Sequence, residues 1–218
     1  MQYKYILFDL DGTLTDPKEG ITTSVQYALR ALGIEEPDRD KLTPFIGPPL
    51  KDSFMKFYGL NEAQTEEAVA KYREWFAPKG IFQNEIYAGV PEMLIALKEN
   101  GLVLAVASSK PQVFVKKILK HFAIEEYFTV VVGSELDGTR GRKEEVVEEA
   151  LRQLKESKSK GCGTVMVGDR NFDIFGGKRY GLVTVGVTFG YAKEGELEEA
   201  GADYVVDTVE ELGRLLLQ

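Results

Sequence analysis

Apolar and polar positions alternate differently in two parts of the chain. From residue 86 onward, short continuous apolar runs are separated by segments in which apolar residues recur every three or four positions. Continuous apolar runs are typical of strands buried on both faces, and the longer spacing is typical of helices with one buried face. The strands predicted in this way, with one near the start of the chain, are Tyr5–Phe8, Leu102–Ala107, Phe128–Val132, Thr164–Val167, Leu182–Val187 and Tyr204–Val206. The accompanying helices are predicted over 91–99, 111–122, 143–155 and 209–217.

Strands that alternate with helices indicate a parallel sheet covered by helices on both faces, built from right-handed strand–helix–strand units. Residues 16–85 show only helical periodicity, with a first helix predicted to start at Asp16-Pro17 and to end before Gly33, and further helices over 50–58 and 62–76. The sequence therefore predicts an α/β protein with two domains. Residues 1–15 and 86–218 are expected to form a Rossmann-like parallel-sheet core, and residues 16–85 an inserted α-helical domain.

Composition and charge limit the partners of such a protein. With 218 residues, of which 44% are hydrophobic, the chain can bury one sizeable core and a smaller appended unit. A formal net charge of −8 argues against a nucleic acid polymer or an anionic membrane as the main partner. The single cysteine, Cys162, excludes an internal disulfide, and no apolar run approaches membrane-spanning length. We therefore expect a cytoplasmic protein.

Two carboxylates follow the first predicted strand. Asp9 and Asp11 are two residues apart, so in an extended chain they point to the same face, and Gly12 then permits a tight turn. Two neighbouring anions repel each other, which implies a bound metal ion, a raised pKa on one of them, or both. Carboxylate ligands favour Mg²⁺. An ordinary strand end followed by an Asp-Gly turn is the alternative interpretation.

Further polar residues follow other predicted strands. Ser108, Ser109 and Lys110 follow the strand that ends at Ala107, Asp169 and Asp173 follow the strand that ends at Val167, and Lys143 begins a helix. Taken singly, Ser108 could cap a helix, Lys143 could be a solvated lysine, and the two aspartates could belong to a turn and a helix cap. Ligands of open parallel sheets, however, bind beyond the carboxyl ends of the strands. Together these residues predict a site for a phosphate and a metal ion.

The same residues, in this order, resemble the motifs of the haloacid dehalogenase-like hydrolases. The matching positions are Asp9–Leu14, Ser108, Lys143 and Gly168–Asp173. Among the members of this family, the phosphoglycolate phosphatase-like and nucleotidase-like enzymes are the most similar. The resemblance covers essentially the whole chain, and residues 16–85 would correspond to the cap domain, which selects the substrate.

The resemblance implies a role for each motif residue. Asp9 would attack the phosphorus to form an aspartyl-phosphate, and Asp11 would protonate the leaving alcohol and later activate water. Ser108 and Lys143 would contact the transferring phosphoryl group. Mg²⁺ would be held by Asp169 and Asp173, together with Asp9 and the backbone carbonyl of Asp11. Phosphate would be contacted by Leu10, Ser109 and Lys110. In the cap, Gly47 lies in a loop that resembles the specificity loop, and Arg73 could contact an anionic substrate or form an ordinary surface ion pair.

Family comparisons narrow the reaction without naming the substrate. Dehalogenases of this family lack an acid at the position of Asp11, and the related mutases carry a histidine in the cap, whereas the one histidine here is His121. Phosphonatases use a cap lysine, and Lys18, Lys51 and Lys56 leave that possibility open. The sequence thus predicts a Mg²⁺-dependent phosphatase that hydrolyses a small phosphomonoester, similar to phosphoglycolate or a nucleoside monophosphate, and that is a monomer or homodimer. Alternatives are an inorganic pyrophosphatase, a sugar-phosphate phosphatase or mutase, and a non-enzymatic phosphate- and Mg²⁺-binding regulatory protein.

Overall fold

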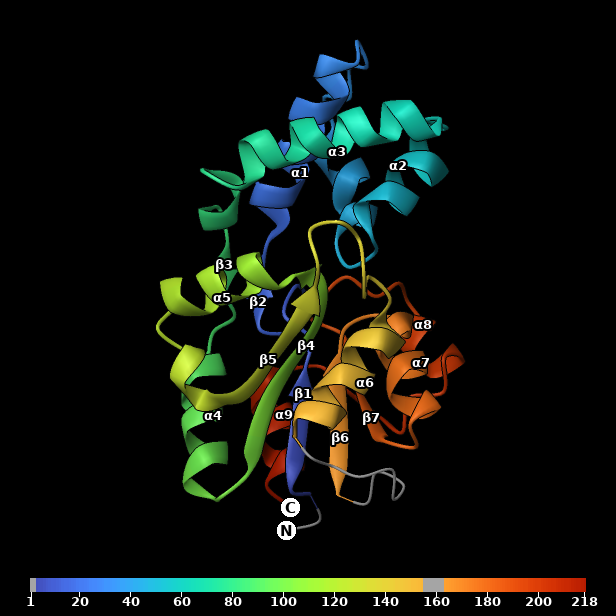
Figure 1. Ribbon diagram of the computed structural model, residues 1–218. Helices are drawn as coiled ribbons and strands as arrows, with labels where there is room; N and C mark the ends of the chain where they lie inside the picture. Colours follow the sequence, from blue (N-terminus) through green and yellow to red (C-terminus); the bar gives the residue numbers. More distant parts are fainter. Residues whose placement is uncertain (1–2, 155–162) are drawn as a thin grey trace. The chain divides into compact units, whose positions relative to one another are not determined.

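A computed structural model describes residues 3–154 and 163–218, and the chain divides into two compact units. The core unit comprises Met1–Asp16 and Ile86–Gln218, and the helical unit comprises Pro17–Glu85 (Figure 1). Each unit has its own buried apolar core, so each is described separately.

The core unit contains the predicted parallel sheet. Its six strands lie in the order β5-β4-β1-β6-β7-β8, and every pair of neighbours is parallel. The strands are β1 (Tyr5–Phe8), β4 (Val103–Pro111), β5 (Phe128–Ser134), β6 (Thr164–Gly168), β7 (Val183–Val187) and β8 (Tyr204–Val206). From β1 the chain first continues to one side, through β4 and β5, and then crosses to the other side, to β6. Such a change of direction opens a crevice at the carboxyl ends of the strands.

Both faces of the central strands are covered. Leu7 of β1 belongs to a buried cluster on one face, together with Ala105, Val146 and Met166, while Ile6 and Phe8 point to the opposite face and are also fully buried. The helices of this unit are α4 (Val90–Glu99), α5 (Gln112–His121), α6 (Lys143–Gln153), α7 (Asn171–Arg179), α8 (Glu196–Glu199) and α9 (Val209–Leu216). Helix α6 packs against β4, β5 and α7, and α4 packs against α9. The α/β fold class predicted from the sequence is thereby confirmed.

Helix α7 was not predicted, because few of its residues are apolar and two adjacent glycines interrupt the pattern. A Cβ atom on Gly176 would lie 2.7 Å from Cγ of Lys143, and one on Gly177 would lie 2.7 Å from Cγ2 of Thr184. The glycines therefore let α7 approach α6 and β7 closely. Glycine lowers helix propensity, but these two glycines are needed because any larger residue would prevent the close packing of α7.

Several boundaries differ from the prediction, and the largest difference is at the end of β4. Strand β4 continues to Pro111 instead of ending at Ala107, and its pairing with β5 is irregular between Ala107 and Pro111. The polar residues of this extension carry no apolar signal, so the prediction ended too early and began the next helix one residue too soon, at Pro111. The predicted end of the helix over 143–155, like Cys162, falls outside the described residues.

The helical unit consists of three α-helices and two short 3₁₀ helices. These are α1 (Lys18–Ala31), α2 (Leu50–Tyr58), α3 (Glu62–Phe76) and the 3₁₀ segments Arg39–Phe45 and Gly80–Phe82. Helix α1 packs against α3, where Val25 and Leu29 of α1 and Tyr72 and Phe76 of α3 are buried. Helix α3 begins with a capping box, in which Asn61 and Gln64 exchange side-chain-to-backbone hydrogen bonds.

The chain passes between the two units through paired segments. Strand β2 (Thr15–Asp16) and strand β3 (Glu85–Ile86) form a two-stranded sheet. Two-residue strands are too short to leave an alternating pattern, and neither was predicted. We refer to β2 and β3 as the crossing segments.

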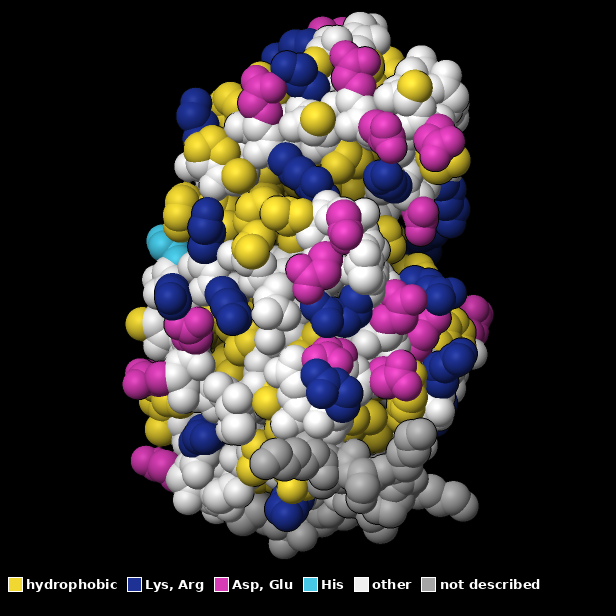
Figure 2. All heavy atoms as spheres, viewed as in Figure 1, with side chains coloured by type: hydrophobic (Ala, Val, Ile, Leu, Met, Phe, Trp, Pro, Cys, Tyr) yellow, Lys and Arg dark blue, Asp and Glu magenta, His cyan; other side chains and the backbone are white. Residues whose placement is uncertain are grey.

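On the face drawn in Figure 2, Lys and Arg side chains are interspersed with Asp and Glu side chains. Over the described part of the chain, no helix is long and apolar enough to cross a membrane. The predictions about nucleic acid, membrane and location remain predictions.

Candidate active site

The first strand ends in a tight turn that places acidic residues at the edge of the sheet. The amide of Asp9 donates a hydrogen bond to the carbonyl of Val167, at 2.9 Å, which holds the end of β1 beside the end of β6. The turn then closes through a 2.7 Å bond from the amide of Gly12 to the carbonyl of Thr15. Gly12 has a φ of +81°, and a Cβ atom here would lie 2.1 Å from Oδ2 of Asp169. The glycine thus satisfies both the turn and the close approach of Asp169.

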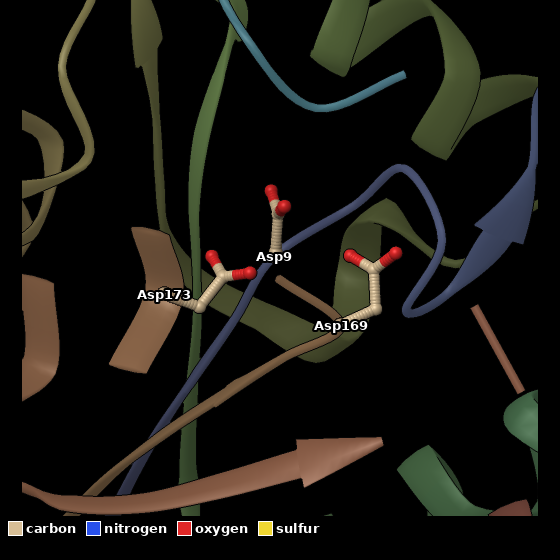
Figure 3. A group of neighbouring side chains, drawn as sticks. All are labelled: Asp9, Asp169 and Asp173. Carbon is tan, nitrogen blue, oxygen red and sulfur yellow. The ribbon is translucent and has the colours of Figure 1, made fainter. Parts of the chain in front are cut away.

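Three buried carboxylates meet at this edge (Figure 3). Asp9 follows β1, Asp169 follows β6, and Asp173 lies in the first turn of α7. One carboxylate oxygen from each lies within 4.8 Å of the others, and at most 4% of any of these residues is exposed. Three segments distant in sequence thereby bring their negative charges into one small, buried volume.

Lys143 compensates part of this charge. Its Nζ lies 2.9 Å from Oδ1 of Asp9 and 2.7 Å from Oδ1 of Asp173, and it donates a 3.0 Å hydrogen bond to the carbonyl of Ala107. Burial disfavours the ammonium form, but the attraction of Asp173 and Asp9 is stronger in sum and raises the pKa of Lys143. Lys143 is therefore a buried cation that bridges two of the three carboxylates.

Asp11 has a different partner. Its Oδ2 lies 2.5 Å from Nζ of Lys110, and both side chains are buried. Among the described residues, the carboxylate of Asp11 is not part of the group formed by Asp9, Asp169 and Asp173. Burial raises the pKa of Asp11, Lys110 opposes this shift, and the charge of Asp9 adds to it. Asp11 is thus a carboxyl group that takes up a proton more readily than an exposed aspartate.

The positions of Asp169 and Asp173 are fixed by backbone amides. Oδ2 of Asp169 accepts a 2.8 Å bond from the amide of Tyr191, and Oδ2 of Asp173 accepts a 3.0 Å bond from the amide of Arg170. Burial, followed by the charges of Asp173 and Asp9, raises the pKa of Asp169 well above its usual range. Burial likewise raises the pKa of Asp173, to about 6, although Lys143 opposes the shift. Both pKa shifts arise first from burial, and the charges of neighbouring carboxylates add to them.

The arrangement fits a divalent cation. If every group is ionised, Asp9, Asp11, Asp169 and Asp173 face only two ammonium groups, which leaves two negative charges unbalanced. Oδ1 of Asp169 is buried and accepts no hydrogen bond, although a buried carboxylate oxygen without a partner is costly. A doubly charged cation with oxygen ligands would balance the charge and occupy this oxygen.

The sequence of this site matches a known family. The family model of the haloacid dehalogenase-like hydrolases matches residues 6–187. This range includes the four carboxylates Asp9, Asp11, Asp169 and Asp173, which we call the acidic site. The chain belongs to this family. This haloacid dehalogenase-like hydrolase is an enzyme of the phosphatase type, as its relatives indicate.

Two curated relatives and one solved structure illustrate the likeness. The chain is 50% identical, over 198 residues, to a 5'-nucleotidase of Pseudomonas aeruginosa, covering 90% of this chain and 88% of that protein. It is 37% identical, over 213 residues, to the tyrosine-protein kinase PtkA of Mycobacterium tuberculosis, covering 97% of this chain and 72% of that protein. The crystal structure of a predicted phosphatase from Clostridium acetobutylicum superposes with a TM-score of 0.95 at 45% identity, covering 100% of this chain and 99% of that one.

The other predicted site residues of this hydrolase are placed as follows. Ser108 is buried within β4, where its Oγ accepts a 3.4 Å bond from the amide of Lys110. It does not cap α5, because the residue at the start of that helix is Pro111. The carbonyl of Ser109 accepts a 2.8 Å bond from Oγ of Ser134. The side chain of Leu10 is fully buried in the apolar interior, so only its backbone can contact a ligand.

Gly47 and Arg73 belong to the helical unit, and their contact with substrate stays a prediction. Gly47 lies between the first 3₁₀ helix and α2, with a φ of +101°. Arg73 is half-buried in α3, and burial lowers its pKa. In the same helix, the ion pair with Glu74 is formed by Lys71, at 2.8 Å.

Two residues that contact the site were missed. Ser134 ends β5 and could have been found, because it comes soon after the apolar run Phe128–Val132, as Ser108 comes after the apolar run that ends at Ala107. Tyr191 lies in a loop after β7, and its contact with Asp169 uses a backbone amide. A contact of that kind leaves no signal in the identity of the side chain.

Proposed function

We propose that this hydrolase is a Mg²⁺-dependent phosphatase that cleaves a small phosphomonoester through an aspartyl-phosphate intermediate, and that nucleoside 5'-monophosphates are its substrate class. The observation that carries the proposal is the placement of Asp9, held at 2.9 Å by Lys143 beside two further carboxylates, with Asp11 on the adjoining turn. The 50% identity to a 5'-nucleotidase supports the substrate class. Phosphoglycolate remains the alternative monoester.

Asp9 is the nucleophile in this proposal. A carboxylate oxygen of Asp9 forms a bond to phosphorus while the bond between phosphorus and the ester oxygen breaks. Lys143 holds the carboxylate in place and is already charged, so it can also stabilise the negative oxygens of the transferring group. In the second step a water oxygen attacks phosphorus, and Asp9 is released together with inorganic phosphate.

Asp11 is the general acid and base. In the first step it donates a proton to the departing alkoxide, and in the second it accepts a proton from the attacking water. Its raised pKa supports the first role, because burial favours the protonated form. Lys110, whose Nζ contacts Oδ2 of Asp11, would also contact a phosphate oxygen.

Asp9, Asp169 and the backbone carbonyl of Asp11 would hold Mg²⁺, with Asp173 bound to the ion directly or through water. When bound, Mg²⁺ would neutralise charge on the phosphoryl oxygens and on the surrounding carboxylates. Ser108 would donate a hydrogen bond to a phosphoryl oxygen, and the amides of Leu10 and Ser109 are further donors.

The helical unit would act as the cap that selects the substrate. The loop that contains Gly47 and the half-buried Arg73 are the proposed contacts for the part of the substrate beyond the phosphate. A cap that closes over the site excludes water and limits the substrate to a small molecule. With a single cysteine in the sequence, a reducing cytoplasm is the location that we infer.

The test is phosphate release from nucleoside 5'-monophosphates, phosphoglycolate, pyrophosphate and sugar phosphates, with Mg²⁺ or with EDTA. We expect Mg²⁺-dependent release, fastest from a nucleoside 5'-monophosphate, and its loss in Asp9→Asn, which keeps the shape of the side chain. Fastest release from pyrophosphate or a sugar phosphate would refute the substrate class. No release from any compound by folded protein that binds Mg²⁺ would refute the enzymatic proposal and favour a regulatory binding protein.

A further inference from the structure

The loop Phe189-Gly190-Tyr191 connects the acidic site with both crossing segments. It lies between β7 and α8 in the core unit, and the proposed mechanism gives it no role. Each of its residues contacts a different part of the site or of the chain that leads to the helical unit. All the contacts described below lie within the core unit.

Tyr191 makes two polar contacts in opposite directions. Its amide donates a 2.8 Å bond to Oδ2 of Asp169, and its phenol donates a hydrogen bond to Oδ1 of Asp16. Asp16 is the last residue of the core unit before the chain enters the helical unit. One residue thus binds both a carboxylate of the acidic site and the end of the first crossing segment.

Gly190 lies against the turn that carries Asp11. A Cβ atom on Gly190 would lie 2.3 Å from the carbonyl oxygen of Gly12 and 2.4 Å from Cβ of Asp169. These distances are too short for any side chain, so the loop lies directly against the backbone of Gly12 and the side chain of Asp169. A shift of the loop would therefore be transmitted to the acidic site, because close-packed atoms leave no free space to absorb it.

Phe189 reaches the second crossing segment. Its ring meets the ring of Tyr87 edge-on, with centroids 5.1 Å apart. Tyr87 follows β3 directly, and its amide donates a 3.2 Å bond to the carbonyl of Leu14. The loop consequently contacts the chain both where it leaves the core unit and where it returns.

We propose that Tyr191 is a positioning residue that couples the carboxylate of Asp169 to the crossing segments, so that a cation bound at the acidic site restricts the chain leading to the helical unit. The inference rests on the proposed metal site. Coupling of this kind is a free energy shared by two sites, so the effect must be reciprocal. Tyr191 acts through Asp169 and Asp16 and does not contact the reacting atoms.

The test compares wild type with Tyr191→Phe, which removes the phenol contact to Asp16 and keeps the amide contact to Asp169. Hydrogen exchange is measured with and without Mg²⁺ on peptides that cover residues 16–21 and 85–90, and Mg²⁺ affinity is measured by calorimetry. Tyr127→Phe, in the short 3₁₀ helix just before β5, removes a phenol elsewhere in the core unit and serves as the matched control.

In wild type and in Tyr127→Phe, we expect Mg²⁺ to slow exchange in both peptides at least about fivefold, the lower end of typical coupling between sites. In Tyr191→Phe, Mg²⁺ should still bind, with an affinity within about threefold of wild type, a difference below 1 kcal/mol, and the slowing should be lost. With a substrate, KM should rise more than kcat falls. A general loss of stability would not abolish the effect of Mg²⁺ on exchange while leaving the Mg²⁺ affinity nearly unchanged.

Two results would overturn the inference. One is exchange in wild type that does not respond to Mg²⁺, and the other is a Tyr191→Phe variant that responds as wild type does. If Tyr191→Phe does not fold, Asp16→Ala removes the same hydrogen bond from the other side, and a retained response in that variant would equally refute the coupling. Neither measurement needs turnover. The coupling can therefore be refuted while the phosphatase proposal holds, and the phosphatase proposal can be refuted while the coupling holds.

Discussion

A Cβ atom on Gly176 would lie 2.7 Å from Cγ of Lys143. Gly176 is on α7 and Lys143 begins α6, so the space left by the missing side chain of one helix is filled by the lysine stem of the other. The charged end of that lysine then reaches Asp9 and Asp173. The position of the proposed nucleophile thus depends on a glycine that carries no functional group.

Substitution Gly176→Ala should displace Lys143. The added methyl group overpacks the contact between α6 and α7, at a cost of about 1–3 kcal/mol in the free energy of unfolding, and phosphate release should fall as the ammonium leaves Asp9. Gly213 in α9 provides the control, because a Cβ atom there would lie at an ordinary 3.4 Å from Met93. Gly213→Ala should be neutral or stabilising by up to about 1 kcal/mol. Equal effects of the two substitutions, in chemical denaturation and in turnover, would refute this role of Gly176.

Removing the buried cation should affect both catalysis and stability. Lys143→Met leaves Asp9 and Asp173 without their shared partner, and loss of such an electrostatic group costs about 10²–10³-fold in kcat. In EDTA, the free energy of unfolding should fall by about 3–5 kcal/mol, the usual cost of breaking a buried pair.

The matched control is Lys178→Met. Lys178 also lies 2.9 Å from an aspartate, Asp203, but both side chains are more than one third exposed. Its loss should cost at most about 1 kcal/mol and leave phosphate release unchanged. A Lys143→Met variant as stable and as active as this control would contradict the bridging role of Lys143.

Without Mg²⁺, the unbalanced negative charges of the acidic site should destabilise the protein. Asp169→Asn removes one unbalanced negative charge from a fully buried position, so in EDTA this variant should be more stable than wild type. Adding Mg²⁺ at 100 times its Kd should stabilise wild type by about 2.7 kcal/mol and leave Asp169→Asn nearly unchanged. Thermal denaturation with and without Mg²⁺ measures both effects. Asp52→Asn, an exposed position on α2, should behave as wild type, and a Mg²⁺ response that persists in Asp169→Asn would exclude Asp169 as a ligand.

Asp203 should make stability depend on pH in the acidic range. It accepts bonds from the amide of Thr184 at 2.8 Å, from Oγ1 of Thr184 at 2.9 Å and from Lys178 at 2.9 Å. Burial would raise the pKa of Asp203, but these contacts outweigh it and lower the pKa. A lowered folded-state pKa stabilises the protein above the unfolded pKa of about 3.9, and this contribution is lost as the pH falls through the folded pKa.

Substitution Asp203→Asn should therefore lower the free energy of unfolding at pH 7 by about 1 kcal/mol, a small value because the side chain is partly exposed and screened. The difference from wild type should shrink as the pH falls below about 4. Urea denaturation across this pH range measures it, with the exposed Glu210→Gln as control. A difference that grows on acidification would contradict the assigned direction of the shift.

The core strands were predictable because each is a continuous apolar run and needs burial on both faces. For the same reason the polar residues that follow the three apolar runs ending at Phe8, Ala107 and Val167 could be expected at one edge of the sheet, since the carboxyl ends of parallel strands lie together. Helix α7 could not be predicted. Its two glycines are explained by contacts with Lys143 and Thr184, and a single sequence does not show which residues will meet.

The sequence by itself determined the α/β class, the helical insertion and the identity of the acidic residues, because periodicity and residue type are local properties of the chain. Only the tertiary structure decided how those residues pair. It assigned Lys110 to Asp11, placed Lys143 between Asp9 and Asp173, and brought the amide of Tyr191 to Asp169. These contacts join segments far apart in sequence. They form because a buried charge or dipole cannot bind water and is stable only when another group of the protein pairs with it.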